Sequence, residues 1–427
     1  MHNCRGLAYP RAPLAEGLCH DGQVPTKSTL ALTGVMLAAL GFIGTLGPFG
    51  TDAYLPAFPA MADDLLVTPS YIGLTLSLFT IGMAVGQFFL GSLSDRIGRK
   101  TVIVGGGLLM AVASALAGFA ADAGVLIVLC LFMGLSASAG VVGGRAVVAD
   151  LTHGEAAVRP FTILGMVVSI GPIIGPMGGT LLLALGGWRA IFFGLAIFAV
   201  ASSVFVALAV PESLPREKRH TGGVTQMFRT AGKVLRDRQY LAFAILIWFG
   251  FGMLFTYISR SSFIVEHNLG LSPAAYSASF GVNGIGLVLA GLLTTRLAKV
   301  VRPRRLIRVG VIAQLTAFAC LWIVLGTGAS SPWTVLPILF VLAASMGFIF
   351  GPATAMAMEH VRFASGTALA LMGSIQFLAA AVAVTIAGIV NPDSLVALAE
   401  VGSVASVLVL VALIMGRARA VTPPPTS

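Results

Sequence analysis

Charged side chains are scarce in this chain. Asp, Glu, Lys and Arg make up only 10% of its 427 residues, whereas an ordinary soluble domain carries about 25%. Hydrophobic residues make up 57%. So few charges do not suit a water-exposed surface, but a helix that faces hydrocarbon must avoid them. The composition therefore excludes an ordinary soluble protein and indicates one that is embedded in a bilayer.

The chain also lacks the motifs of several chemistries. Its four cysteines, Cys4, Cys19, Cys130 and Cys320, show no paired or metal-ligand spacing. Cys4 or Cys19 could ligate a metal together with His20, but we expect a disordered tail there instead. No Gly-Lys-Ser/Thr phosphate loop, His-Glu-x-x-His or Gly-x-Ser-x-Gly element occurs. These absences predict a protein that is not an enzyme, has no metal or cofactor, and does not itself hydrolyse ATP.

Long apolar runs are what the chain has in quantity. A helix needs about 20 residues to cross a bilayer, and twelve runs are long enough. We therefore expect an all-α membrane protein with spanning helices at residues 29–55, 71–91, 101–120, 124–147, 161–184, 188–210, 239–260, 272–295, 306–326, 333–356, 365–389 and 394–416. The first run exceeds the apolar core of a cleavable signal peptide, so it is predicted to stay uncleaved.

The basic residues predict the orientation. An even number of crossings puts both termini on one side. If that side is the cytoplasm, 24 of the 26 Lys and Arg residues are cytoplasmic, and only Arg189 and Arg260 lie near the outer face. Positive loops stay inside, so we expect cytoplasmic termini and a place in the bacterial inner membrane. The net charge of +10 then orients the helices beside anionic lipid and is not a nucleic-acid surface.

A single long polar interval divides the twelve runs into two sets of six. The sequence therefore predicts two six-helix bundles, at residues 29–210 and 239–416, joined by a cytoplasmic linker at 211–238. Tails at 1–28 and 417–427 complete the chain. In transporters with this plan, substrate binds near the midplane between halves that rock against each other.

The most specific motif is the stretch GSLSDRIGRK at residues 91–100. It resembles the signature loop of the major facilitator superfamily, G-x-L-a-D-r-x-G-r-k, and the resemblance implies that superfamily's fold and a secondary transporter. It further implies a charge cluster that latches the two halves shut inside, with residues 364–367 of the eleventh helix as its partner. The alternative is that these charges are solvated topology determinants. The latch residues would be Gly91, Asp95, Arg96, Gly98, Arg99, Lys100 and Asp150.

The fifth apolar run contains the stretch IGPIIGPMGG at residues 170–179. Two Gly-Pro pairs and a Gly-Gly would destroy a water-exposed helix, but in a bundle they give a bent, flat-sided helix that a neighbour can pack against. Generic small-residue packing would explain the glycines without the prolines. The stretch resembles the motif of the superfamily's antiporter branch, which implies drug export against protons. The motif residues are Gly171, Pro172, Gly175, Pro176, Gly178 and Gly179.

The stretch TDAYLPAFPA at residues 51–60 closes the first run. It resembles the corresponding element of Bcr/CflA-type drug-resistance transporters, which chloramphenicol and florfenicol exporters share in part. A carboxylate within the bundle is costly when charged, so Asp52 is the candidate group for loading and releasing the coupling proton. The alternative is an interfacial acid that is hydrogen-bonded at a kink.

Two positions depart from that family. Arg260 stands where the family usually has a small residue; it could contact an anionic substrate, pair with Glu266 or snorkel to the outer surface, and we expect it to snorkel. Cys130 stands where the fourth helix usually has an arginine thought to serve proton coupling. Asp52 therefore has no obvious charge partner in the first half.

The combined prediction is a secondary active exporter that exchanges a small amphiphilic drug or metabolite for protons in the inner membrane, as a monomer. The alternative is an exporter dedicated to one compound, such as a phenicol or a self-produced metabolite. Proton symport is disfavoured by the antiporter motif, and a membrane enzyme or a sensor by the lack of clustered catalytic groups or an output domain. Candidate cavity residues are Phe49, Tyr54, Met166, Tyr257, Arg260, Asn283, Met346, Phe350 and Gln376.

Overall fold

The computed structural model describes residues 32–152, 158–215, 224–359, 361, 365–391 and 393–415. The predicted tails at 1–28 and 417–427 lie outside these ranges. All regular elements within them are helices, in agreement with the predicted all-α class. They are α1 (Gly34–Gly44), α2 (Leu46–Asp52), η1 (Leu55–Ala57), α3 (Phe58–Asp64), α4 (Pro69–Ile97), α5 (Arg99–Gly118), α6 (Ala123–Leu151), α7 (Val158–Ala209), α8 (Val224–Val234), α9 (Arg238–Phe263), η4 (Ile264–Asn268), α10 (Pro273–Leu297), α11 (Pro303–Thr327), α12 (Pro332–Glu359), α13 (Ser365–Val390) and α14 (Ser394–Met415).

Polar residues mark where several of these helices begin. The side chains of Thr33, Thr68, Asp122, Asp237 and Ser272 each accept a hydrogen bond from a backbone N–H in the first turn of α1, α4, α6, α9 and α10. Such caps satisfy N–H groups that have no partner within the helix. The sequence thus specifies the helix starts locally, while the apolar runs specify their lengths.

Eleven segments of the described chain are long and apolar enough to cross a membrane. One of them, Ile163–Ala209, has 47 residues and is interrupted by non-helical backbone at Gly186 and Gly187, where Gly187 has a φ of 71°. That positive φ favours glycine. Because the break divides α7 into two crossings, the structure agrees with the predicted twelve.

The first predicted crossing is not one helix ending near residue 55. It is broken at Thr45 and again around η1, and it continues to Asp64. Pro56 lies in η1, and Pro59 lies in the first turn of α3. A proline lacks the N–H that would continue the preceding helix, which explains why the chain bends here.

The predicted loop at residues 91–100, between helices at 71–91 and 101–120, is also wrong in its extent. Helix α4 continues to Ile97 and α5 begins at Arg99, so the only residue between them is Gly98. Gly98 has a φ of 109°, a conformation that side-chain-bearing residues rarely adopt. The junction is therefore a single-residue turn, and the end of the bundle that carries it is called the Gly98 end below. The end that carries the break in α7 is called the Gly187 end.

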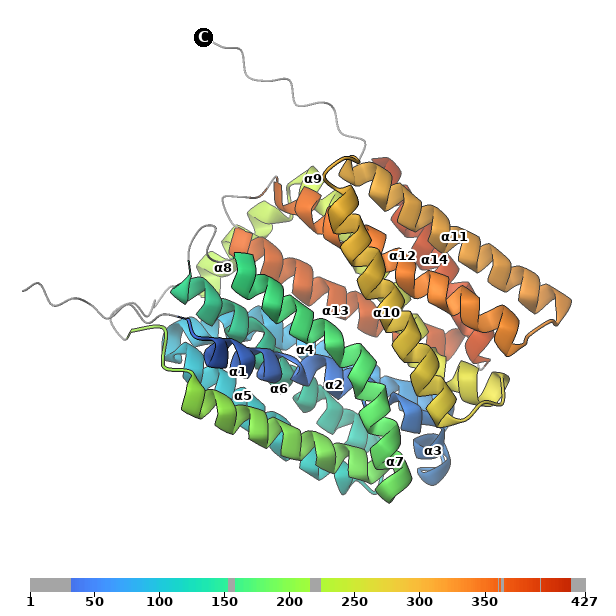
Figure 1. The fold of residues 1–427 in the computed structure, drawn as a ribbon, viewed down its shortest axis with the longest axis horizontal. Coiled ribbons are helices and arrows are strands. Elements are labelled where there is room, and N and C mark those ends of the chain that lie inside the picture. The colour runs from blue at the N-terminus through green and yellow to red at the C-terminus, as the bar shows by residue number, and fades with distance from the viewer. Residues whose placement is uncertain are drawn as a thin grey trace, which may run out of the picture. The chain divides into compact units, whose positions relative to one another are not determined.

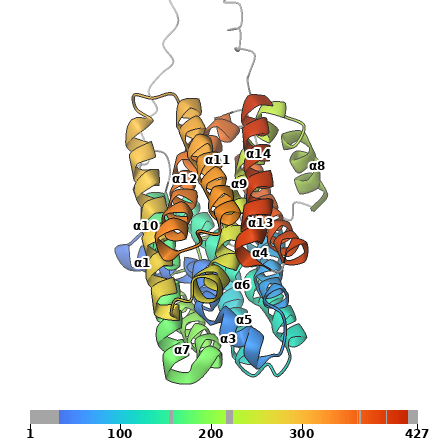
Figure 2. The ribbon, with the colours of Figure 1, turned by 90° about the vertical axis from the view of Figure 1, so that its right-hand side faces the viewer.

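Helices α1 to α7 and α9 to α14 form two groups, shown from blue to green and from yellow to red in Figures 1 and 2. In the first group α4 packs on α6, and α5 packs on α6 and α7. In the second, α9 packs on α12, α13 and α14, and α12 packs on α10 and α11. The groups meet along two seams, α4 against α13 and α7 against α10.

Hydroxyl groups join the halves at both seams. Thr180 Oγ1 on α7 lies 2.6 Å from Ser277 Oγ on α10, and Ser277 Oγ donates to the carbonyl oxygen of Pro176 over 3.0 Å. At the other seam, Thr385 Oγ1 on α13 donates to Ser77 Oγ on α4 over 3.1 Å. The α7–α10 bonds lie in the part of α7 that leads to the Gly187 end.

Candidate transport and coupling site

Asp52 is a buried carboxyl at the end of the short helix α2. Its side chain is 3% exposed, and its Oδ1 accepts no hydrogen bond from the residues that the structure describes. A buried polar atom without a partner is costly and marks a candidate functional group. The sequence placed Asp52 within the bundle, and the structure does the same.

The glycines of the antiporter motif explain how α7 can pack against this segment. A Cβ added at Gly175 would lie 3.4 Å from the Cβ of Asp52, and one at Gly179 would clash with the carbonyl oxygen of Ala53. A Cβ added at Gly171 would clash with the side chain of Pro48. These glycines are four residues apart and so share one face of α7. Nothing lies within 4 Å of a Cβ at Gly178, so this glycine is not needed for that contact.

Polar side chains of both halves lie near Asp52. A charge on Asp52 would act electrostatically on the hydroxyls of Tyr54, Tyr257 and Tyr276. Asn283 Nδ2 donates to the Tyr257 hydroxyl over 2.6 Å, and Ser261 Oγ lies 3.2 Å from the Tyr276 hydroxyl. Tyr276 and Asn283 share one face of α10. Asp52 therefore lies where groups of both halves converge.

Arg260 does not reach the outer surface. It is only 3% exposed, and its Nη2 lies 3.3 Å from where a Cβ of Gly388 would be. The expectation that it snorkels is therefore wrong, because α13 and the start of α4 cover it. Of the described carboxylates, none forms an ion pair with Arg260, and Glu266 Oε1 is itself buried without a hydrogen-bond partner. Cys130 is fully buried near Tyr54, so it brings no positive charge to this region.

The charges of the signature stretch meet around Arg99 at the Gly98 end. Arg99 Nη1 lies 2.7 Å from Asp95 Oδ1, and Arg99 Nε lies 3.0 Å from Asp150 Oδ2. Arg99 Nη1 also donates to Ser94 Oγ over 2.7 Å, and Lys100 Nζ donates to the carbonyl oxygen of Ala207 over 2.6 Å. The guanidinium thus joins the end of α4 to the end of α6. Of the predicted partner segment 364–367, residue 364 lies outside the described residues and 365–367 begin α13; the latch between the halves stays a prediction.

Two residues of this cluster were missed by the sequence analysis. Glu212 Oε1 accepts hydrogen bonds from the backbone N–H groups of Arg99, over 2.9 Å, and of Leu214, over 3.1 Å. Ser213 Oγ donates to Asp150 Oδ2 over 2.9 Å. The Pro-Glu-Ser that begins the linker was interpreted only as a polar boundary. In the sequence, the only indication of the Glu212 contact is that this acid directly follows an apolar run.

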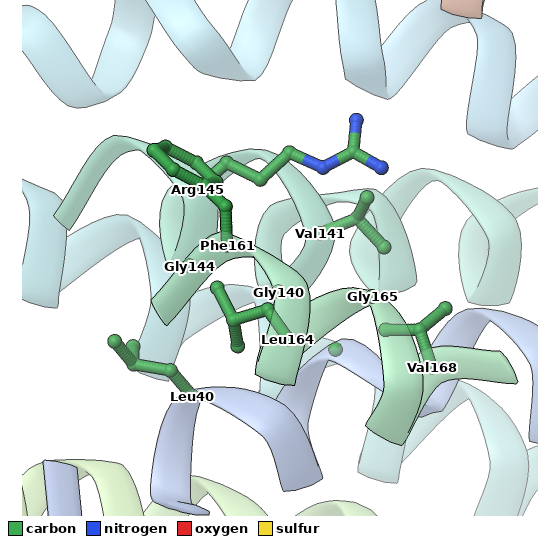
Figure 3. Close-up of a pocket in the computed structure, with 10 residues that line it drawn as sticks. Leu40, Gly140, Val141, Gly144, Arg145, Phe161, Leu164, Gly165 and Val168 are labelled. Atoms are coloured by element: carbon green, nitrogen blue, oxygen red, sulfur yellow. The ribbon is translucent and has the colours of Figure 1, made fainter. Parts of the chain in front are cut away.

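A pocket of about 270 Å³ opens between α1, α6 and α7. Its lining is apolar apart from Arg145, whose side chain is exposed on α6 (Figure 3). The other lining residues are Leu40, Gly44, Gly140, Val141, Gly144, Phe161, Leu164, Gly165 and Val168. None of the nine candidate cavity residues belongs to this set, and their contact with substrate stays a prediction.

Most of those candidates are packed in the interior. Tyr54 and Met346 are fully buried. The ring of Phe49 lies 5.0 Å from that of Phe198, and the ring of Phe350 lies 5.9 Å from that of Phe251. Met166 is 56% exposed, and Gln376 is half-buried.

Comparison with known proteins gives the same assignment as the motifs. The chain is 30% identical over 353 residues to the uncharacterized MFS-type transporter YdgK of Bacillus subtilis, covering 82% of this chain and 87% of that one. It is 26% identical to the bicyclomycin resistance protein homolog of Haemophilus influenzae, covering 82% and 88%. It is also 26% identical to multidrug resistance protein D of Escherichia coli, covering 80% and 85%. These relatives confirm the resemblance to Bcr/CflA-type drug-resistance transporters.

The fold has solved counterparts as well. The crystal structure of a D-xylose-proton symporter matches with a TM-score of 0.71 at 16% identity, over 88% of this chain and 96% of that one. The family model described as Major Facilitator Superfamily matches residues 37–384. From its helices, its motifs and these matches, the chain is a multi-pass inner-membrane transporter, not an enzyme, and it belongs to the Major Facilitator Superfamily.

Proposed function

We propose that this transporter exports amphiphilic drugs or metabolites from the cytoplasm in exchange for protons. The positive-inside rule assigns the Gly98 end to the cytoplasm, and the hydroxyl contacts of the α7–α10 seam then lie toward the outer side. Export is supported by the antiporter motif, which packs directly on the Asp52 segment, and by the resistance named for two of the relatives. We expect the protein to act as a monomer without a bound cofactor.

The observation that carries the proposal is the burial of Asp52 between the halves. An enclosed carboxylate is costly, so we expect Asp52 to hold a proton when the halves are closed around it. Rocking of the halves would expose the same carboxyl alternately to either side of the membrane. A proton taken up outside and released inside would then drive the exchange of substrate in the opposite direction.

Transport by an Asp52→Asn variant tests this proposal. We expect the wild type to protect a pump-deleted bacterium against at least one of phenicols, ethidium, tetracycline or bicyclomycin-like compounds. An uncoupler and Asp52→Asn should each abolish that protection, because the amide cannot exchange the proton. Asp63→Asn is the matched control, since Asp63 is an exposed acid eleven positions beyond Asp52.

The outcomes separate the parts of the proposal. Protection that survives Asp52→Asn but not the uncoupler would move the coupling to another group. Protection against one compound alone would favour the dedicated exporter. Absence of efflux for every compound in energised vesicles would contradict drug export itself.

A further inference from the structure

The pocket beside Arg145 combines an apolar interior with one positive charge. Its ten lining residues include no acid, and Arg145 donates no hydrogen bond and forms no ion pair among the described residues. In Figure 3 the guanidinium points away from the apolar side chains of Leu40, Leu164 and Val168. A free guanidinium offers five N–H donors in a planar fork that matches a carboxylate.

The pocket lies away from the Asp52 segment, toward the Gly98 end. Arg145 follows Cys130 by fifteen residues on α6, which at about 1.5 Å per residue is about 22 Å along the helix. Phe161 precedes Gly175 on α7 by a similar number of residues. A compound that enters from the cytoplasm therefore meets Arg145 before it reaches Asp52.

The packing of the glycines indicates that the pocket is built into the helices. A Cβ at Gly140 would clash with the carbonyl oxygen of Ile43, and one at Gly144 would lie 3.6 Å from the carbonyl oxygen of Leu40. Gly140 therefore lets α1 approach α6 closely, and both glycines line the pocket beside Arg145. A volume of about 270 Å³ is near the lower limit of small-molecule sites, so the site suits one ring system and its substituents.

We propose that Arg145 and this pocket form an entry site that selects amphiphilic compounds carrying a carboxylate or a strong hydrogen-bond acceptor, and that it disfavours lipophilic cations. The role of this pocket as an entry site rests on the proposed export function, whereas the binding of such compounds to the pocket does not. The apolar body of the compound occupies the space lined by Leu40, Phe161 and Leu164. Its acceptor group bonds the guanidinium, whose charge repels a cation at the same position.

Binding to the purified, full-length protein tests the site. The protein is placed in nanodiscs of phosphatidylcholine, which has no net charge and so supplies no anionic lipid as a competitor. The probes are chloramphenicol hemisuccinate as the anion, chloramphenicol as the uncharged compound, and tetraphenylphosphonium as the cation. The variants are Arg145→Gln, Arg145→Lys and, as a control, Arg308→Gln, because Arg308 is exposed on α11 and does not line the pocket.

We expect the wild type to bind the anion more tightly than the cation. Arg145→Gln should weaken binding of the anion by about fivefold or more, since even solvent-screened unit charges in contact contribute this much. It should weaken binding of the uncharged compound less and should not weaken binding of the cation. Arg145→Lys should restore most of the anion binding, and Arg308→Gln should change nothing. Equal melting temperatures of the variants would show that the fold is kept.

Three results would overturn the site. They are an unchanged Kd for the anion in Arg145→Gln, tighter wild-type binding of the cation than of the anion, and no wild-type binding of either phenicol. The export function is judged separately by efflux in cells. The expected order of binding without efflux would contradict the proposed function alone, whereas efflux whose charge preference ignores Arg145 would contradict this site alone.

Discussion

Gly178 and Gly179 are adjacent on α7 but have different surroundings. A Cβ at Gly179 would clash with the backbone of Ala53, while a Cβ at Gly178 would have nothing within 4 Å. Both glycines belong to the antiporter motif, and the sequence does not distinguish them. Only the packing of α7 on the Asp52 segment shows which one is sterically required.

We therefore predict opposite outcomes for two alanine substitutions. Gly179→Ala should lower both thermal stability and transport, because backbone atoms cannot yield as a flexible side chain can; overpacking of this kind costs about 1–3 kcal/mol. Gly178→Ala should be neutral or stabilising by up to about 1 kcal/mol, since alanine is the better helix former. Thermal unfolding in detergent and drug efflux measure the two effects. Equal behaviour of the two variants would contradict the packing described here.

At this scale the sequence was informative where a backbone constraint selects the residue. Gly98, Gly171 and Gly179 were found because a side chain would be strained or would clash at these positions, and Asp52 was found because an acid within an apolar run is rare. Arg260 was misjudged because its burial depends on α13 and α4, which are distant in sequence. Arg145 was counted among the cytoplasmic charges but not among the site residues, since nothing local shows that α1 and α7 form a pocket beside it.

Several elements end together at the Arg99 cluster. Arg99 connects the end of α4 with the end of α6, and Glu212 connects the start of the linker with the first turn of α5. The carboxylate of Glu212 also lies at a helix N-terminus, where the helix dipole favours a negative charge. The cluster therefore fixes how the helices of the first half end relative to one another.

The two carboxylates that pair with Arg99 should contribute unequally to the stability of the folded protein. The Asp95 side chain is 45% exposed, whereas that of Asp150 is 22% exposed and also accepts from Ser213. Exposed ion pairs contribute about 0–1 kcal/mol, and hydrogen bonds to charged groups about 1.5–3 kcal/mol. We expect Asp150→Ala to lower the melting temperature clearly more than Asp95→Ala. A double-mutant cycle with Arg99→Ala measures each pairing, and a larger coupling for Asp95 would refute this ranking.

The elements themselves were predicted well, apart from their junctions. The lengths of the apolar runs located the crossings, because apolar length is a local property of the chain. The continuation of α4 to Ile97 and the breaks in the first crossing depend on how the helices pack, so sequence boundaries missed them. The attachment of Glu212 to α5 joins residues more than one hundred positions apart, and no local pattern reports it.

In the part of the molecule that the structure describes, hydroxyl groups connect the two halves at two seams. The hydroxyls of Thr180 and Ser277 join one seam, and those of Thr385 and Ser77 join the other. If the halves rock during transport, the α7–α10 contact must separate once in every cycle. Alternating access predicts that a covalent bond at this position stops turnover.

We predict that the double variant Thr180→Cys with Ser277→Cys transports when reduced and stops when oxidised. The two oxygens are 2.6 Å apart, so the sulfur atoms of the variant would be close enough to join. Adding a reductant should restore efflux, and each single variant should be insensitive to oxidation. Continued transport by the fully cross-linked protein would show that this seam stays closed throughout the cycle.

The two faces of α7 would respond differently to being pulled apart. Against the Asp52 segment, α7 makes contact through glycines that fit a neighbouring backbone, and separation there would leave empty space that no side chain can fill. Against α10, it makes contact through hydroxyl groups, and water can replace each of those hydrogen bonds at little cost. A force between the halves would therefore part α7 from α10 first. The first half would move as one body with α7 attached. Each time α7 and α10 came together again, the hydroxyls of Thr180 and Ser277 would meet as before.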